Sequence, residues 1–270
     1  MQHRETQSAA PTPRLGAIFQ LERREQIMAR VVEEGRVDVA DLAEMFDVTS
    51  ETIRRDLTEL QREQLVRRVH GGAVPWRRST LVPKLEVREA SNVEEKRRIA
   101  RAATRELPES GSILIDSGST AAYFADLIDR ERDLTVITNS VPIVRALAST
   151  PRPEVIVIGG TLQRRTMAFV DEAGVDALRD ISVDVLFIGC DGMSPERGFT
   201  TPFRSEVAIK RAMIAAARKT VMLMDHSKVR NDQLFRFAAI DEIDMIITGT
   251  EVDETTATRL QELGPLVTRV

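Results

Sequence analysis

The sequence has few of the residues that build disulfide frameworks and metal centres. It contains one cysteine and three histidines in 270 residues. A single cysteine excludes an internal disulfide framework, and the scattered histidines lack zinc-binding spacing, so we expect no metal site and no cofactor. Cys190 has no base beside it and ends an apolar run, which indicates a small buried filler and not a nucleophile.

Long apolar runs are also missing. No stretch reaches the roughly 18 consecutive apolar residues of a membrane helix, and the start, MQHRETQSAAPTPRLG, lacks the apolar region of a secretory signal. We therefore expect a cytoplasmic protein without membrane contact, in which residues 1–20 form a disordered leader. The chain is 42% hydrophobic and 30% charged, as in globular proteins, and is long enough for one large domain or two smaller ones.

Positive charge is distributed unevenly along the chain. The net charge is −4, but residues 49–78 carry seven arginines against four acids, a local charge of +3. Residues 22–48 carry four arginines against eight acids. Overall acidity therefore does not exclude nucleic acid, because the positive charge is concentrated in one short segment.

Residues 21–75 have the pattern of a winged helix-turn-helix. LERREQIMARVVEEG reads as a helix closed by Gly35, and VDVADLAEMF reads as a second helix. Thr49 can cap a third, SETIRRDLTELQREQ, whose Ile53, Leu57 and Leu60 share one face. LVRRVHGGAV then reads as strand, glycine turn and strand. Three short helices followed by a hairpin predict a DNA-binding unit.

The third helix is expected to enter the major groove. Arginine suits this role because its planar fork binds guanine bidentately or clamps a phosphate. Arg54 and Arg55 could instead be ordinary solvated residues, but the capped spacing and the following wing favour DNA. We interpret Asp56 as one side of an ion pair within the domain that orients an arginine. The predicted DNA-binding residues are Thr49, Ser50, Glu51, Thr52, Arg54, Arg55, Arg67, Arg68 and His70.

The remainder of the chain predicts a linker and a larger α/β domain. Residues 75–92 hold two prolines and no sustained periodicity, so we assign 76–92 to a linker. Over 93–270, helical patterns separate apolar runs typical of strands buried on both faces. These runs are 112–116, 134–138, 154–159, 183–189, 220–225 and 244–249. The expected fold class is thus an N-terminal winged helix-turn-helix domain followed by a larger α/β domain with a mostly parallel sheet.

Short polar motifs follow five of these predicted strands. Ligands of such sheets bind beyond the carboxyl ends of the strands. Gly118 would let the backbone approach an anion, Ser119 and Thr120 add hydroxyl groups, and the helix start adds free N–H groups. Each motif alone could be an ordinary satisfied turn. Five at one end of a sheet favour a phosphate-type ligand site, with Lys228 adding positive charge.

Nearly the whole chain from about residue 23 resembles the DeoR-type sugar-sensing transcriptional repressors. The resemblance is carried by TIRRDLTEL, LVRRVHGGAV, EEKRRIA, IDSGSTA, LTVITNS, VIGGTL, GFTTP, KRAM and DHSK, in this order. It implies a winged-helix domain joined to a sensor domain that binds a phosphorylated sugar. It also implies a homo-oligomer, dimer or tetramer, that represses transcription from double-stranded operator DNA and is released by its effector.

The sensor part is in turn similar to the ribose-5-phosphate isomerase fold. Residues 118–120 match the isomerase phosphate cradle, and 225–228 match a second isomerase turn. Isomerases carry two acids in the motif that reads Asp191-Gly192-Met193-Ser194 here, so the second acid is absent. Glu206 would correspond to the catalytic base. Losing one acid can leave binding intact while impairing proton transfer, so we expect a sensor with no catalytic residue.

The alternative is an isomerase-like enzyme with an appended DNA-binding domain, since Asp191, Glu206 and the lysines remain. The predicted effector-binding residues are Asp116, Ser117, Gly118, Ser119, Thr120, Asn139, Ser140, Gly160, Asp191, Glu206, Lys210 and Lys228.

Overall fold

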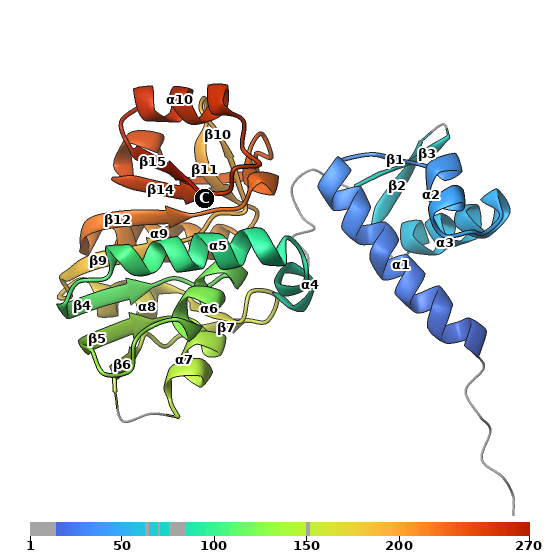
Figure 1. The fold of residues 1–270 in the computed structure, drawn as a ribbon. Helices are drawn as coiled ribbons and strands as arrows, with labels where there is room; N and C mark the ends of the chain where they lie inside the picture. The colour runs from blue at the N-terminus through green and yellow to red at the C-terminus, as the bar shows by residue number, and fades with distance from the viewer. Residues whose placement is uncertain (1–14, 63–64, 70, 76–84, 150–151) are drawn as a thin grey trace, which may run out of the picture. The chain divides into compact units, whose positions relative to one another are not determined.

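The computed structural model describes residues 15–62, 65–69, 71–75, 85–149 and 152–270. The chain divides into two compact units between Arg77 and Arg78 (Figure 1). Residues 85–92, which the sequence assigned to a linker, belong to the second unit. They include α4 (Leu85–Ala90), whose first side chain is buried. The short helix was missed because six residues are too few to show a helical period.

The first unit is a winged helix, which confirms the prediction. Its helices are α1 (Leu15–Glu34), α2 (Val39–Met45) and α3 (Ser50–Arg62). Its strands β1 (Val37–Asp38), β2 (Val66–Val69) and β3 (Gly72–Pro75) form an antiparallel sheet in the order β1-β3-β2. Helix α1 begins at Leu15, so residues 15–20, which the sequence predicted to be disordered, are helical. The last helix-breaking residue, Pro13, precedes this start.

Side chains from all three helices form the core of this unit. Ile27, Leu42, Ile53 and Leu57 are at most 1% exposed. Gly72 is required where β3 passes β1, because a Cβ there would lie only 1.9 Å from the carbonyl oxygen of Val37.

A buried carboxylate ties α3 to α1. Asp56 is fully buried and accepts hydrogen bonds from Arg23 Nε at 2.7 Å and Arg24 Nε at 3.0 Å. Gln20 Nε2 also donates to this carboxylate at 3.4 Å. The expected ion pair within the domain is confirmed, and its partners come from the first helix.

We expect Asp56→Ala to lower the free energy of unfolding of the first unit by about 2–4 kcal/mol, since two charge-assisted bonds to a buried group are lost. Calorimetric unfolding of the full chain measures this. Glu59→Ala is the matched control, because its pair with Arg62 is exposed and worth about 0–1 kcal/mol. Equal effects of the two substitutions would contradict the role given to Asp56.

The second unit is built on a seven-stranded parallel sheet in the order β15-β14-β12-β9-β4-β5-β6. The predicted mostly parallel sheet is confirmed, whereas the sequence predicted six of these strands and no strand order. Its strands are β4 (Ser110–Ile115), β5 (Asp133–Thr138), β6 (Glu154–Val157), β9 (Val183–Ile188), β12 (Ala217–Leu223), β14 (Met245–Thr248) and β15 (Leu266–Arg269). Strand β15 was not predicted, because this edge strand buries none of its four side chains and lacks the apolar run of the others.

Two smaller antiparallel elements accompany this sheet. One has three strands, β10 (Gly192–Ser194), β11 (Gly198–Thr201) and β13 (Phe235–Ala238). The other is the hairpin of β7 (Thr161–Gln163) and β8 (Ala168–Val170).

Helices cover both faces of the large sheet (Figure 1). On one face lie α5 (Val93–Ala103), α6 (Ser119–Asp126) and α7 (Val141–Leu147), and on the other α8 (Glu172–Leu178), α9 (Arg204–Ala215) and α10 (Glu254–Glu262). Successive residues of β4 serve the two resulting cores. Ile113 and Ile115 pack in one and Leu114 in the other. Both faces being buried explains the apolar runs without alternation.

The order of the strands creates a crevice between β4 and β9. The chain runs from β4 through α6 to β5 on one side, while β9 and then β12 lie on the other side of β4. The order in which successive strands join the sheet therefore reverses between β4 and β9, and open parallel sheets bind ligands at such a point. Within the described residues, no helix combines the length and the hydropathy needed to cross a bilayer.

Candidate functional site

Helix α3 presents its arginines on the face opposite its buried stripe. Side-chain exposure is 53% for Arg54 and 78% for Arg55. Thr49 caps the helix, because its hydroxyl oxygen accepts the N–H of Thr52 at 3.2 Å. Glu51 lies 3.6 Å from Arg54 and 4.0 Å from Arg55, but such exposed pairs are weak and leave both guanidinium groups available.

The wing is bonded to the same helix. Arg68 Nη1 donates to the Thr58 hydroxyl at 3.2 Å, and its backbone N–H donates to Gln61 Oε1 at 3.2 Å. Arg67, its neighbour on β2, is exposed. His70 lies outside the described residues. Among the described residues, α3 and the wing together carry five exposed arginines, Arg54, Arg55, Arg62, Arg67 and Arg68.

In the second unit, a small pocket that is partly open to solvent lies beyond the ends of β4, β9 and β12. Eight of the residues predicted to bind the effector line it, namely Ser117, Gly118, Ser119, Thr120, Asp191, Glu206, Lys210 and Lys228. Four predicted residues do not line it, namely Asp116, Asn139, Ser140 and Gly160. Residues not predicted from the sequence also line it, among them Arg88, Thr166, Cys190 and Asp225.

The start of α6 forms one wall of this pocket. Gly118 adopts φ 152°, a conformation that favours glycine, and its carbonyl accepts the first helical bond, from Ala122 N. The amides of Ser119, Thr120 and Ala121 therefore have no acceptor inside the helix. These donors, with the hydroxyl groups of Ser119 and Thr120, suit an anionic group.

A buried lysine holds the floor of the pocket. Lys210 Nζ donates to Asp116 Oδ2 at 2.5 Å and to the carbonyl of Gly189 at 3.0 Å. Burial alone would lower the pKa of Lys210, but the carboxylates of Asp116 and Glu206 hold this pKa above its ordinary value. Asp116 thus acts behind the pocket by fixing Lys210, which explains why it does not line the cavity itself.

Glu206 and Asp191 share one hydroxyl group. Thr201 Oγ1 lies 3.0 Å from Asp191 Oδ2 and 2.9 Å from Glu206 Oε2. Burial, with the negative charge of Asp191, raises the pKa of Glu206 to about 7. Because a hydroxyl group has a single proton, the arrangement is satisfied when protonated Glu206 donates to Thr201 and Thr201 donates to Asp191.

Two lysine side chains lie close to the carboxylate of Asp225, which follows β12. Lys228 Nζ and Lys96 Nζ lie 3.7 and 3.9 Å from Asp225 Oδ2, and Asn92 Nδ2 donates to Oδ1 at 3.0 Å. Burial would raise the pKa of Asp225, but Lys228 and Lys96 hold it well below its usual range. Burial lowers the pKa of Lys96 to about 8.

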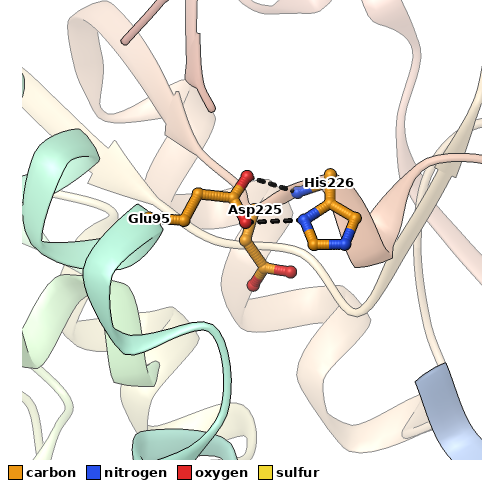
Figure 2. Close-up of side chains that lie close together, drawn as sticks. All are labelled: Glu95, Asp225 and His226. Carbon is orange, nitrogen blue, oxygen red and sulfur yellow. Dashed lines mark hydrogen bonds and ion pairs between the residues drawn. The ribbon is translucent and has the colours of Figure 1, made fainter. Parts of the chain in front are cut away.

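Next to Asp225, the fold brings together an acid and a histidine that are far apart in sequence. Glu95 accepts the backbone N–H of His226 at 2.8 Å, and Glu95 Oε2 lies 2.6 Å from His226 Nδ1 (Figure 2). Burial raises the pKa of Glu95. Candidate ligand atoms of Glu95, Asp225 and His226 lie within 4.8 Å of one another. Two lysines beside Asp225 would oppose a cation, so we interpret the cluster as an ion-pair network.

Unpartnered polar atoms are concentrated in this pocket. Among the described residues, ten buried side-chain nitrogen and oxygen atoms lack a hydrogen-bond partner, and five of them belong to residues that line the pocket. The five atoms are Arg88 Nε, Arg88 Nη2, Thr166 Oγ1, Glu206 Oε1 and Asp225 Oδ2. The last of these has ion-pair contacts with Lys96 and Lys228 but no hydrogen bond. Because buried polar groups are normally satisfied, these atoms are donors and acceptors that water or a polar ligand in the pocket would satisfy.

The predicted residues that lie off the pocket have structural contacts. Asn139 Nδ2 donates to the carbonyl of Phe169 at 3.0 Å, and Ser140 N donates to Thr138 Oγ1 at 3.1 Å. A Cβ at Gly160 would lie 2.7 Å from Asp171, so this glycine permits close packing. These three turns therefore support the hairpin of β7 and β8, beside the pocket.

Ser194, where the isomerase resemblance requires a second acid, does not line the pocket. Its hydroxyl donates to Asp232 Oδ2 at 3.0 Å and accepts the Arg197 N–H at 3.2 Å. Asp232 does not line the pocket either. Burial raises the pKa of Cys190 to about 12, consistent with the inert filler expected from the sequence.

Most of the additional pocket residues stand in segments without a recognisable sequence motif. Arg88 stands in a segment that was assigned to the linker, and Thr166 stands in the turn between β7 and β8. Asp225 belongs to the DHSK motif, of which only Lys228 was selected. Of these three residues, only Asp225 could have been predicted to line the pocket, because it is a charged residue at the end of a predicted strand.

A winged helix joined to an α/β unit with a polar pocket is the architecture of one class of proteins, the transcriptional regulators with a sensor domain. Two family models match this chain. The DeoR-like helix-turn-helix domain matches residues 23–78, and the DeoR C terminal sensor domain matches residues 91–250. The chain therefore belongs to the DeoR family of transcriptional regulators, as the sequence motifs indicated.

Named relatives are similar over most of their length. The HTH-type transcriptional regulator GlpR of Haloferax volcanii is 32% identical over 246 residues, which cover 91% of this chain and 96% of the relative. The glycerol-3-phosphate regulon repressor of Escherichia coli (strain K12) is 31% identical over 229 residues, covering 85% and 90%.

Among solved structures, ribose 5-phosphate isomerase A from Methanocaldococcus jannaschii is similar. It shares 19% identity, covers 52% of this chain and 56% of its own, and has a TM-score of 0.39. A likeness at this level carries no argument about the site.

The pKa of Glu206 predicts how pH changes stability. Because the folded chain keeps the Glu206 proton up to about pH 7, whereas the unfolded chain loses it near pH 4.5, this group destabilises the fold increasingly across that window. Glu206→Gln should therefore raise Tm relative to the unsubstituted protein more at about pH 8 than at about pH 5. Glu196→Gln, at an exposed pair, is the control. A Tm difference independent of pH would contradict the raised pKa.

Proposed function

We propose that this regulator binds operator DNA through α3 and the wing, and that a phosphorylated metabolite bound in the pocket of the second unit controls this binding. The concentration of unpartnered buried donors and acceptors around the pocket supports the ligand site most directly. The free amides at the start of α6 support an anionic end to that ligand.

The charge around the pocket supports a mononegative or dinegative ligand. Its lining carries three cationic side chains, Arg88, Lys210 and Lys228, against Asp191, Asp225 and Glu206. With Glu206 protonated, the lining has one excess positive charge. The carboxylates of Asp191 and Asp225 can accept hydrogen bonds from hydroxyl groups, as recognition of a sugar requires.

The relatives support the chemical class of the effector and the direction of control. The Escherichia coli relative is named a glycerol-3-phosphate regulon repressor. We extend this to the present chain as a repressor of a carbohydrate operon, controlled by a sugar or polyol phosphate. A cytoplasmic homo-oligomer on paired operator sites fits this proposal, because two recognition helices read half-sites one helical turn apart.

The DNA part of the proposal predicts different losses for helix and wing. Arg54→Ala and Arg55→Ala should weaken binding to an operator selected from random DNA by about 1–3 kcal/mol, if each reads a base. Arg68→Ala should weaken binding to all sequences similarly and lower the salt slope by about 1. Fluorescence anisotropy across a salt series measures both.

Arg30→Ala, in α1, is the control for this series, since Arg30 pairs with Glu34 on the same helix. If both helix variants bound the operator with unchanged affinity, α3 would not be the recognition helix.

The effector part is tested by a thermal-shift screen of the full chain across sugar and polyol phosphates, including glycerol 3-phosphate. A ligand at 100 times its Kd adds about 2.7 kcal/mol of stability. Thr120→Glu should abolish the shift and leave DNA binding intact, because a carboxylate at the start of α6 repels the anion. Lys228→Ala should weaken the phosphorylated ligand more than its dephosphorylated form. Equal weakening would remove Lys228 from the phosphate site.

A second candidate, an isomerase-like enzyme, is favoured by Glu206, whose pKa of about 7 suits general acid–base chemistry. We expect no turnover, because Asp191 is engaged by Arg88 and Thr201 and the second acid is missing. Solvent proton exchange at C1 and C2 of the stabilising ligand decides between the candidates. Exchange at about 1–10³ per second would establish an enzyme.

A further inference from the structure

Helix α4 is the first described element of the second unit. The segment between it and β3 is the only covalent connection to the winged helix. The described hydrogen bonds of α4 include two to other parts of the sensor unit. Leu85 N donates to Arg165 O at 3.2 Å, and Tyr123 Oη donates to Glu89 O at 2.9 Å. One of its side chains, Arg88, lines the pocket.

One nitrogen of the Arg88 guanidinium group is hydrogen-bonded within the protein, and the other two are not. Its side chain is 12% exposed, and Nη1 donates to Asp191 Oδ1 at 3.2 Å. Nε and Nη2 are both buried, and none of the described residues offers either an acceptor. These two nitrogens form the side-on fork of the guanidinium group, whose parallel N–H bonds match two oxygens of one phosphate or carboxylate.

We infer that Arg88 binds the anionic group of the effector through this fork, together with the amides at the start of α6, and that the effector thereby acts on α4. The inference rests on the proposed function and deepens it. A role for Arg88 in neutralising Asp191 explains the Nη1 bond, but it does not explain two buried donors without acceptors, which are costly in a folded protein.

The C-terminal end of α4 is fixed to the same pocket. Buried Lys96 donates to the carbonyl oxygens of Arg88 and, at 2.6 Å, of Ser91. Asn92 Nδ2 donates to Asp225, which lines the pocket. An anion that engages Arg88 would therefore hold α4 against both the β4–α6 wall and the end of β12.

Through Arg88, the effector would contact the protein more extensively when α4 is docked on the pocket than when it is not. A ligand shifts a conformational equilibrium only as far as it binds one state better than the other. States in which α4 departs from the pocket lose the fork, so an anion favours the docked state of α4. Because α4 is the first described helix of the sensor unit, its docking holds the part of the chain that follows the connection to the winged helix.

Substitution by lysine separates the two roles of Arg88. Arg88→Lys keeps the positive charge and a donor for Asp191 but removes the side-on fork. Arg101→Lys, at an exposed position of α5, is the matched control. Arg88→Gln is measured in parallel, and ligand-free melting shows that each variant is folded.

The experiment is calorimetric titration of the full-length proteins with inorganic phosphate, followed by hydrogen exchange of residues 85–90. We expect Arg88→Lys and Arg88→Gln to weaken phosphate binding on the order of 10- to 100-fold. Phosphate should slow amide exchange in α4 of the unsubstituted protein and of Arg101→Lys, and not in the Arg88 variants.

The outcomes separate this inference from the proposed function. If Thr120→Glu abolished phosphate binding while both Arg88 variants bound it with unchanged affinity, the role of Arg88 would be refuted and the phosphate site would stand. If the Arg88 variants lost affinity but phosphate left exchange in α4 unchanged in the unsubstituted protein, the action on α4 would be refuted. If the unsubstituted protein bound no phosphate, the proposed site and this inference would both be wrong.

Discussion

The ion pair between Lys210 and Asp116 is the contact on which the ligand pocket depends. Lys210 reaches from α9 to Asp116 after β4 and to the Gly189 carbonyl after β9, so one ammonium group joins the two strands that border the crevice. Both side chains are nearly inaccessible to water. Removing either partner would leave a buried charge uncompensated, which is far more destabilising than losing an exposed pair.

The other charges of the pocket are arranged around this pair. Asp191 is matched by Arg88, and Asp225 by Lys96 and Lys228, while Glu206 remains without a cation of its own. The burial that isolates Glu206 also brings its pKa near neutrality. A group of this kind can serve proton transfer or simply donate a hydrogen bond, and the neighbours determine which. Here Asp191, which shares the Thr201 hydroxyl with Glu206, is also bonded by Arg88.

The two units present their charges for different purposes. In the winged helix, Asp56 is buried against Arg23 and Arg24 and serves the fold, whereas Arg54 and Arg55 are exposed and paired only weakly. In the sensor unit, the charges lie inside, where the low dielectric strengthens their interaction with a ligand. Exposed arginines suit a polyanionic surface such as DNA, and enclosed charges suit one small molecule.

The sequence by itself determined the winged helix, the parallel sheet and the start of α6. These features depend on local periodicity, caps and glycine positions, which neighbouring residues specify. Only the tertiary structure decided that Asp116 lies behind the pocket, that Ser194 faces Asp232, and that Arg88 lines the site from a segment without a clear pattern. Such placements depend on contacts between residues as far as 103 positions apart in the chain, as with Arg88 and Asp191, and no local pattern encodes which buried charges meet.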